Sequence, residues 1–389
     1  MTGIGIIAEF NPLHKGHEYL INKAKQQGIV VCVISGNFVQ RGDTAVAEKR
    51  VRALAALKAG ADIVLELPVL WSMSTAQNFA LGGISALKYA GCDKIIFGSE
   101  YGDTDELFKA SDILTSRDFS SLVSEKLKRG VTFAAARQSA AEILGVKSGI
   151  LEGANNNLGI EYISAAKALD YGVQFETVKR NGAHHDSMEE AEFVSAALLR
   201  EKLKNQDYKF CGKYVRKDIL DLFQYENMSD ISNIEMGILA VLRTKSAEQL
   251  RKLPDLSEGI ENKLFYSISI ARSLEELYNT MKVKRYTLAR IRRLALSAFL
   301  GEDDTFFMKP LPYLRVLGFS KDGEKYLKEK LKNPPVPLIN RASDTIKLDS
   351  RSKLVFDTEV RATDLYLLSL NNPQPCGLEY KAKIIKTGA

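Results

Sequence analysis

Short apolar runs alternate with helical segments through the first hundred residues, and this alternation constrains the fold more than any other feature of the chain. The apolar runs read as buried strands at Gly3–Ala8, Ile29–Ser35, Asp62–Leu67 and Lys94–Phe97. Helical periodicity covers His17–Gln27, Glu48–Ala59 and Thr75–Ala90 between them. Strand–helix–strand units at this spacing predict a parallel sheet with helices on both faces.

The pattern changes about halfway along the chain. Tyr171–Lys179 reads as a late strand, and a polar turn and a helix follow it up to about Lys204. Helical periods then dominate to about Leu300, and the tail is expected to hold short strands such as Lys353–Phe356. We therefore expect an α/β fold with a Rossmann-like domain over residues 1–204 and a mostly helical C-terminal domain over residues 205–389.

Composition excludes several classes of protein. The 389 residues are 45% hydrophobic and 26% charged, which are values of a folded globular chain. No apolar run reaches the roughly 18 residues that a membrane span needs. The four cysteines lie far apart without a CxxC pair, so neither a disulfide framework nor a zinc knuckle is expected, and a reducing cytoplasm fits. The net charge of +6 permits a polyanionic partner.

All four histidines lie in two polar turns that follow predicted strands. His14 and His17 follow the first strand, and His184 and His185 follow the late one. In open parallel sheets, ligands bind in the crevice at the carboxyl ends of the strands. The scarce imidazoles are therefore expected at the ligand site, although exposed surface histidines remain the alternative for His184 and His185.

The first turn reads Asn11-Pro12-Leu13-His14-Lys15-Gly16-His17, an H-x-G-H pattern at the start of a helix. Gly16 lets the backbone approach a ligand closely, and the helix N-terminus offers unpaired N–H groups to phosphate. Two imidazoles beside it can stabilise charge that develops on an α-phosphate. A helix-entry turn with two surface histidines is the alternative; a zinc site would need a third ligand that the sequence does not supply.

The wider sequence resembles the bacterial tRNA(Met) cytidine acetate ligase family, within the superfamily that carries H-x-G-H on a Rossmann-like nucleotidyltransferase domain. The resemblance spans nearly the whole chain. It rests on GIIAEFNPLHKGHEYLI, SGNFVQRGDTAVAEKRVRALAALKAGADIVLELP, FGSE, NNNLGIEY, KRYTLARIRR and PYLRVLGF. It implies that ATP and acetate form an acetyl-adenylate and pyrophosphate. The N4 amine of the wobble cytidine in elongator tRNA(Met) then attacks the acetyl carbon, and AMP leaves.

The resemblance also implies site residues. His14 and His17 would be catalytic. ATP would be bound by the continuous segment Ile7, Ala8, Glu9, Phe10, Asn11, Pro12, Leu13, His14, Lys15, Gly16, His17, Glu18, Tyr19, Leu20 and by Gly98, Asn155 and Arg180. Asn156 and Asn157 compete with Asn155 for its role, and plain turn, capping or surface roles stay open for all of these. Magnesium is expected to screen the triphosphate, with ligands that the sequence leaves unknown.

A basic segment near the middle of the second domain is the expected tRNA surface. Its cations are Lys282, Lys284, Arg285, Arg290, Arg292 and Arg293. On a helix, Lys282, Arg285 and Arg292 or Arg293 would form a basic stripe that neutralises phosphates, and Tyr286 could stack on a base. A solvated amphipathic helix is the alternative. Arg41, after the second strand, could contact phosphate, acetate or RNA, and a simple surface salt-bridge role is the alternative for Arg41, Lys49 and Arg50.

One stretch departs from the pattern that it resembles. The superfamily opens a later helix with a motif similar to I-S-S-T-x-I-R, whereas this chain has Ser195-Ala196-Ala197-Leu198-Leu199-Arg200. Ala197 lacks the threonine hydroxyl, and Arg200 remains a candidate phosphate contact. Two other functions stay open: a small-molecule adenylyltransferase that uses the same H-x-G-H chemistry, and a non-enzymatic RNA-binding protein with a decayed nucleotide site, which Ala197 alone supports.

Overall fold

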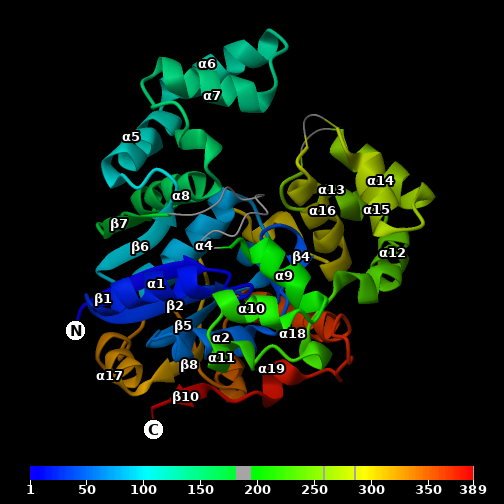
Figure 1. The fold of residues 1–389 in the computed structure, drawn as a ribbon. Coiled ribbons are helices and arrows are strands. Elements are labelled where there is room, and N and C mark those ends of the chain that lie inside the picture. Colours follow the sequence, from blue (N-terminus) through cyan, green and yellow to red (C-terminus); the bar gives the residue numbers. More distant parts are fainter. Residues whose placement is uncertain (181–193, 257–258, 284–285, 389) are drawn as a thin grey trace.

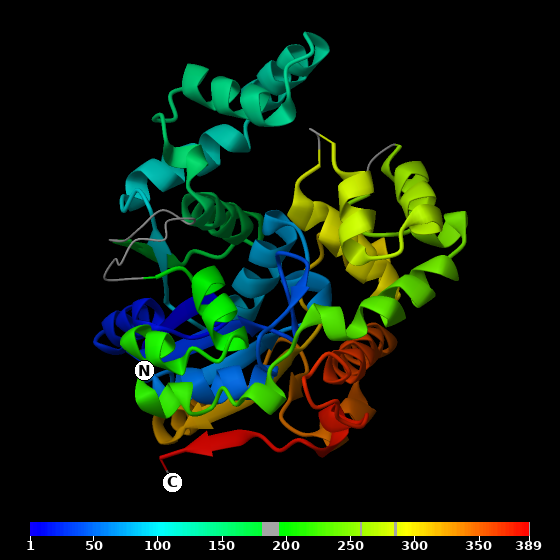
Figure 2. The ribbon, with the colours of Figure 1, turned by 45° about the vertical axis from the view of Figure 1, so that its right-hand side comes forward.

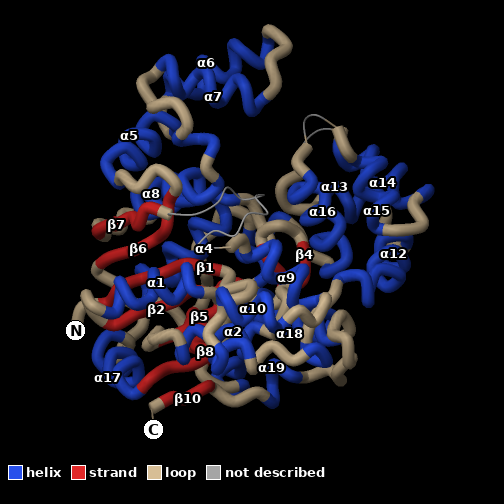
Figure 3. The backbone as a smooth tube through the Cα atoms, viewed as in Figure 1, coloured by secondary structure: helices blue, strands red, loops and turns tan. Residues whose placement is uncertain are grey.

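A central sheet organises the molecule. The computed structural model describes residues 1–180, 194–256, 259–283 and 286–388. The eight-stranded sheet has the order β10-β8-β5-β2-β1-β6-β7, with β9 beside β8 (Figures 1 and 3). Its strands are β1 (Gly3–Ala8), β2 (Ile29–Ser35), β5 (Ile63–Leu67), β6 (Lys94–Ser99), β7 (Gln174–Lys179), β8 (Leu314–Ser320), β9 (Leu338–Ile339) and β10 (Ile385–Thr387). A separate hairpin pairs β3 (Phe38–Val39) with β4 (Asp43–Thr44).

The strands predicted up to residue 179 and their parallel arrangement are confirmed. β1 pairs in parallel with β2 and β6, β2 with β5, and β6 with β7. Because alternate residues of β2 enter opposite cores, with Val31 and Val33 on one face and Val30 and Cys32 on the other, both faces of the sheet are buried. A strand buried on both faces must be apolar throughout, which is the pattern that the sequence has.

Helices connect and cover the strands. Those of the first half are α1 (Lys15–Lys25), α2 (Lys49–Lys58), α3 (Val69–Ser72), α4 (Ala76–Tyr89), α5 (Thr104–Leu114), α6 (Arg117–Lys128), α7 (Phe133–Ile143) and α8 (Ala154–Ala168). Those of the second half are α9 (Ala196–Lys204), α10 (Tyr208–Tyr214), α11 (Lys217–Leu220), α12 (Glu235–Arg243), α13 (Ala247–Arg251), α14 (Ile260–Ile270), α15 (Leu274–Met281), α16 (Leu288–Leu300), α17 (Lys321–Lys330), α18 (Ser350–Leu367) and α19 (Leu378–Lys381).

Apolar cores hold these elements together, and a small one of Val123, Ala136 and Ala140 joins α6 to α7. Helices α4 and α8 cover one face of the sheet, and α1, α2, α9 and α10 cover the other. Helices α12 to α16 enclose a third core that α18 also joins. Figures 1 and 2 show α12–α16 as a lobe to one side of the sheet, and the α6–α7 pair projecting from the end near β7. Across the described ranges, no helix is both long and apolar enough to cross a membrane.

The second half of the chain also contributes to the sheet. β8 pairs antiparallel with β5, and β10 pairs in parallel with β8. Both strands lie beyond residue 204, so residues from both sides of the expected division build one sheet. The division into domains at residue 204 itself remains a prediction.

The short strand expected at Lys353–Phe356 is wrong, because these residues lie within α18. Val355, Phe356, Glu359, Ala362 and Thr363 are all buried, and their spacing is that of one helical face. A run of four residues was too short to show this period.

A buried cluster of ions joins α18 and α19, near the end of the chain, to α2 and β5. Lys49 on α2 is fully buried, and its Nζ contacts carboxylates of Glu66 on β5, Glu359 on α18 at 2.8 Å and Glu379 on α19 at 2.7 Å. Two arginines complete the charge balance, since Arg315 pairs with Glu66 and Glu379 and Arg50 pairs with Glu379. Buried carboxylates are stable only when they are paired and hydrogen-bonded, so the cluster depends on Lys49.

We expect Lys49→Met to lower the free energy of unfolding by about 3–5 kcal/mol, because it leaves three buried carboxylates short of one cation. Urea denaturation followed by circular dichroism measures this loss. Lys58→Met is the matched control on the same helix, where Lys58 is half-exposed and only 3.7 Å from Asp218; its effect should stay within about 0.5 kcal/mol. Equal stability of the two variants would contradict the role given to the cluster.

Candidate functional site

The turn between β1 and α1 places two histidines at the start of a helix. His14 is the N-cap of α1, and its Nδ1 accepts from the backbone N–H of Gly16 at 3.1 Å. The His14 and His17 rings are stacked with their centroids 3.9 Å apart, and Phe10 contacts the edge of His17. The H-x-G-H spacing thus brings both imidazoles to the positive end of the helix dipole.

Both imidazoles are neutral at pH 7. Burial and the charge of Arg180 lower the pKa of His14 to about 3. Burial, His14 and Arg180 likewise hold the pKa of His17 well below its ordinary value. Because the Nδ1 of His14 already accepts a hydrogen bond, its proton is on Nε2. His14 therefore offers an N–H donor to a ligand without bringing a fixed charge.

Three hydrogen bonds fix the backbone of this turn. The Oδ1 of Asn11 accepts from the Val46 N–H at 2.8 Å, and its carbonyl accepts from the Arg200 Nη1 at 2.8 Å. The carbonyl of Glu9 accepts from the fully buried Arg52 at 2.7 Å. Elements remote in sequence therefore hold the turn, which makes the histidines part of a rigid framework.

The ends of β6 and β7 bring two further predicted residues together. Gly98 lies on β6, and a Cβ built on it would approach the Arg180 side chain to 3.3 Å. Arg180 follows β7 directly, and its backbone N–H donates to the carbonyl of Ser99. Since the Arg180 charge also lowers the pKa of both histidines, this guanidinium lies beside the H-x-G-H turn.

Asn155 lies at the first turn of α8 and is held by Glu100. The carboxylate of Glu100 accepts from the Asn155 Nδ2 at 2.7 Å, and from the backbone N–H groups of Asn155 and Asn156 at 3.1 and 2.8 Å. A Cβ on Gly153 would lie 2.5 Å from this carboxylate, so only glycine leaves room for it. Asn156 and Asn157, the competing asparagines, donate instead to nearby backbone carbonyls.

Many side chains in the segment from Ile7 to Leu20 face away from the histidines. Ile7 and Leu13 belong to the apolar cores, and Leu20 packs against one of them. Glu18 pairs with Arg216 at 2.8 Å, while Lys15 and Tyr19 are exposed. The structure thus brings His14, His17 and Arg180 together and adds Gly98 beside Arg180; it leaves most of the segment as scaffold.

The basic stripe expected on one helix is wrong. Lys282 is the C-cap of α15, which ends at Met281, and Thr287 is the N-cap of α16, so Lys282 does not share a helix with Arg290, Arg292 and Arg293. Arg290 and Arg293 both contact Asp255, and Arg293 also donates to the carbonyl of Gln40. Arg292 lies over the ring of Tyr278. Lys284 and Arg285, like His184 and His185, lie outside the described residues.

The loop after β2 links the site to the helical lobe. The N–H of Gln40 donates to the Glu9 carboxylate at 3.0 Å, and its carbonyl accepts from Arg293 at 3.2 Å. Gly42 has a φ of +71°, and a Cβ there would lie 2.6 Å from the Cβ of Arg292. Only glycine permits this contact. Lys49 and Arg50 do form salt bridges, but the expected surface location is wrong, because Lys49 is fully buried and Arg50 is largely covered.

Sequence reasoning missed Glu100 and Arg52. FGSE ends a strand. Nothing in the sequence shows that its glutamate accepts hydrogen bonds from the first turn of a helix more than fifty residues later. Arg52 looked like one more polar residue of an amphipathic helix. As for metal, no group of three or more His, Cys, Asp or Glu residues that could hold an ion occurs in the part of the chain that the structure describes.

The chain matches the HIGH Nucleotidyl Transferase family over residues 1–380. A relative from Caldanaerobacter subterraneus subsp. tengcongensis, named tRNA(Met) cytidine acetate ligase, is 37% identical over 99% of this chain and 100% of its own. One of the same name from Thermoanaerobacter sp. is 36% identical over 98% and 99%.

A solved structure has the same fold. The crystal structure of Thermotoga maritima TmcAL bound with alpha-thio ATP is 28% identical, covers 99% of both chains and has a TM-score of 0.89. Its apo form has a TM-score of 0.91 with the same coverage. Since the family match and these relatives both extend over nearly the whole sequence, the chain belongs to the HIGH nucleotidyl transferases and, among them, to the tRNA(Met) cytidine acetate ligase family.

Proposed function

We propose that the protein uses ATP to ligate acetate to N4 of the wobble cytidine in elongator tRNA(Met), through an acetyl-adenylate. The observation that best supports this is the pair of stacked, neutral histidines at the start of α1, with Arg180 beside them. The relatives that share the whole chain carry the name of this activity. The Nε2–H of His14 and the Arg180 guanidinium are donors that suit a polyphosphate whose charge grows on one phosphate during reaction.

In the proposed first step, an oxygen of acetate attacks the α-phosphorus of ATP. A P–O bond to that oxygen forms, the bond to the β-phosphate breaks, and pyrophosphate leaves with the electron pair. The Nε2–H of His14, the His17 ring and the amides of the first turn of α1 would stabilise the charge on the α-phosphate oxygens. Acetate is already ionised at pH 7, so this step needs no general base.

In the proposed second step, the N4 amine attacks the acetyl carbon. A C–N bond forms, the C–O bond to AMP breaks, and the amine loses one proton.

Magnesium is expected to arrive with the triphosphate, since the described residues offer no cluster of ligands for a resident ion. The role of the basic segment in binding tRNA is part of the proposal and is best supported for the exposed Lys282. A cytoplasmic location is also proposed; all four cysteines are free thiols.

Under this proposal, Glu100 determines which end of the Asn155 side-chain amide faces the nucleotide. Burial raises the pKa of the Glu100 carboxyl, but hydrogen bonds from Asn155 and Asn156 outweigh it and lower the pKa overall. An ionised carboxylate only accepts hydrogen bonds, so it fixes the Asn155 amide with its NH₂ toward Glu100. The Oδ1 is then left to accept from a donor on the nucleotide, such as the 6-amino group of adenine.

His17→Ala should slow acetate-dependent exchange between ATP and pyrophosphate at least about 100-fold, because a group that stabilises the reacting phosphate is lost. The affinity for tRNA should be unchanged. Asn22→Ala, an exposed position on the same helix, is the control and should exchange normally. Normal exchange by His17→Ala would remove the histidine from the reaction.

Glu100→Gln should reduce the preference for ATP over GTP by about 10-fold, since Gln can face Asn155 with either end of its amide and no longer fixes its orientation. Exchange rates with ATP, GTP and 2′-deoxy-ATP measure this. A merely structural role would slow all nucleotides equally. If the selectivity for 2′-deoxy-ATP changes instead, Asn155 reads the ribose rather than the base.

A further inference from the structure

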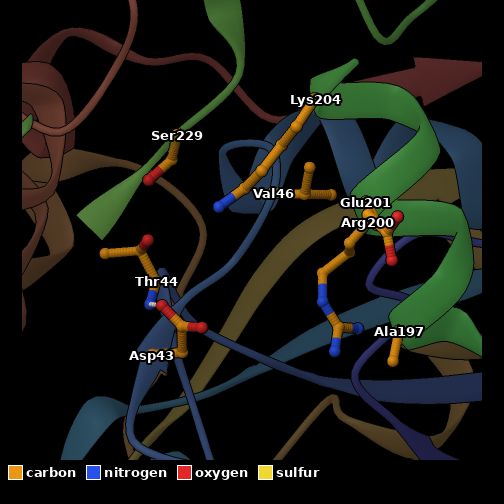
Figure 4. A pocket seen from close by; sticks show the side chains of 8 residues that line it. All are labelled: Asp43, Thr44, Val46, Ala197, Arg200, Glu201, Lys204 and Ser229. Atoms are coloured by element: carbon orange, nitrogen blue, oxygen red, sulfur yellow. Dashed lines mark hydrogen bonds between the residues drawn. The ribbon is translucent and has the colours of Figure 1, made fainter. Parts of the chain in front are cut away.

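A pocket of about 280 Å³ lies between α9 and the β4 strand, next to the H-x-G-H turn. Its lining residues are Asp43, Thr44, Val46, Ala197, Arg200, Glu201, Lys204 and Ser229. In Figure 4 the side chains of α9 approach from one side, and Asp43 and Thr44 lie on the other. Ala197, Arg200, Glu201 and Lys204 are spaced as one face of a helix, so a single stripe of α9 forms that wall.

The pocket shares its inner wall with the turn that carries the histidines. Val46 donates its backbone N–H to the Asn11 side chain, and Arg200 donates to the Asn11 carbonyl, each at 2.8 Å. Asn11 lies only three residues before His14. A group bound in the pocket would therefore lie against the backbone that positions the proposed adenylate site.

The charges in the pocket favour a neutral ligand with both donors and acceptors. Asp43 is partly exposed, and burial raises the pKa of its carboxyl despite the nearby charges of Lys204, Arg292 and Arg200. Glu201 adds a second carboxylate at the exposed rim. Two carboxylates oppose a triphosphate, whereas Arg200 and Lys204 offer N–H donors beside them. Lys204 is itself held by Asp230 at 2.8 Å.

We propose, building on the proposed function, that this pocket receives the cytosine base of the acceptor tRNA. Asp43 accepts a hydrogen bond from the N4 amine, and Arg200 and Lys204 donate to the ring acceptors N3 and O2. The volume holds a pyrimidine with part of its ribose. An unpaired loop base can turn out of its stack into such a pocket at little cost.

Asp43 then has a role in the transfer step. As the N4 lone pair forms the bond to the acetyl carbon and AMP leaves with the electrons of the broken C–O bond, the amine proton moves to the Asp43 carboxylate and from there to solvent. Uracil has a carbonyl oxygen in place of the amine. The same carboxylate would repel it, so Asp43 also discriminates between the two pyrimidines.

Ala197 gains a function in this arrangement. Its methyl group lines the pocket where the superfamily pattern has a threonine. The smaller side chain widens the space in front of Arg200. Alanine in place of threonine at position 197 thus enlarges the proposed base site.

The test separates the two half-reactions in one protein. Asp43→Asn is nearly isosteric, and it should retain acetate-dependent ATP–pyrophosphate exchange within about twofold while transfer of labelled acetate to tRNA falls at least 100-fold. Ala197→Phe, which fills the pocket without changing charge, should give the same split. Lys204→Ala should weaken transfer, whereas Lys202→Ala, on another face of the same helix, should not.

Any other result of these assays would overturn a defined part of the proposal. Transfer by Asp43→Asn and Ala197→Phe at the rate of the unmodified protein would overturn the pocket alone. Loss of both half-reactions in Asp43→Asn would assign Asp43 to the nucleotide site and also overturn the base pocket. Exchange without transfer by the unmodified protein, or neither activity, would overturn the proposed function and with it the identity of the base.

Discussion

The fully buried Lys49 is the interaction on which the rest of the structure depends. It lies among three carboxylates that come from β5, α18 and α19, and Arg50 and Arg315 complete the balance of charge. Burial and the neighbouring Glu66 carboxylate raise the pKa of Glu359, and the Lys49 ammonium opposes this shift. Such a cluster costs free energy to form but tolerates only one arrangement of its members. It therefore fixes how the end of the chain docks onto the sheet formed by its beginning.

The same cluster positions the loop that reaches the site. The backbone N–H of Lys49 donates to the Asn37 side chain, and the amide of Asn37 donates to Thr363 on α18. Asn37 begins the loop that holds Gln40 against Glu9. A continuous set of contacts thus runs from the buried ions to the histidine turn. The helical lobe joins it through Arg293 and Gln40.

Sequence patterns predicted the central strands and the histidine turn because strong local signals specify both. Strands buried on two faces must be apolar throughout, and His14 with Gly16 defines a helix start by itself. The failures involve partners that are distant in sequence. Asp255 pairs with Arg293 of the expected basic stripe and with the nearby Arg290, and Glu100 fixes Asn155 across more than fifty residues. No local period encodes such contacts. The motif PYLRVLGF was recognised by resemblance, but its place as an antiparallel strand beside β5 appears only in three dimensions.

Both proposed steps use one rigid framework. The turn after β1 is fastened by Arg52, Val46 and Arg200, and two of these three residues also line the pocket beside it. Under the two proposals, the activated acetyl group and its acceptor amine would meet where the histidine turn borders the pocket beside α9. Helix α9 contributes to both, because Arg200 fastens the turn and also lines the pocket.

The most direct test of the account is the nucleoside composition of tRNA after reaction. Elongator tRNA(Met) would be incubated with the purified protein, ATP, magnesium and labelled acetate, digested, and analysed by mass spectrometry. The account predicts labelled N4-acetylcytidine that requires both ATP and acetate. The account would be contradicted if the cytidine stayed unmodified while AMP was transferred to another acceptor.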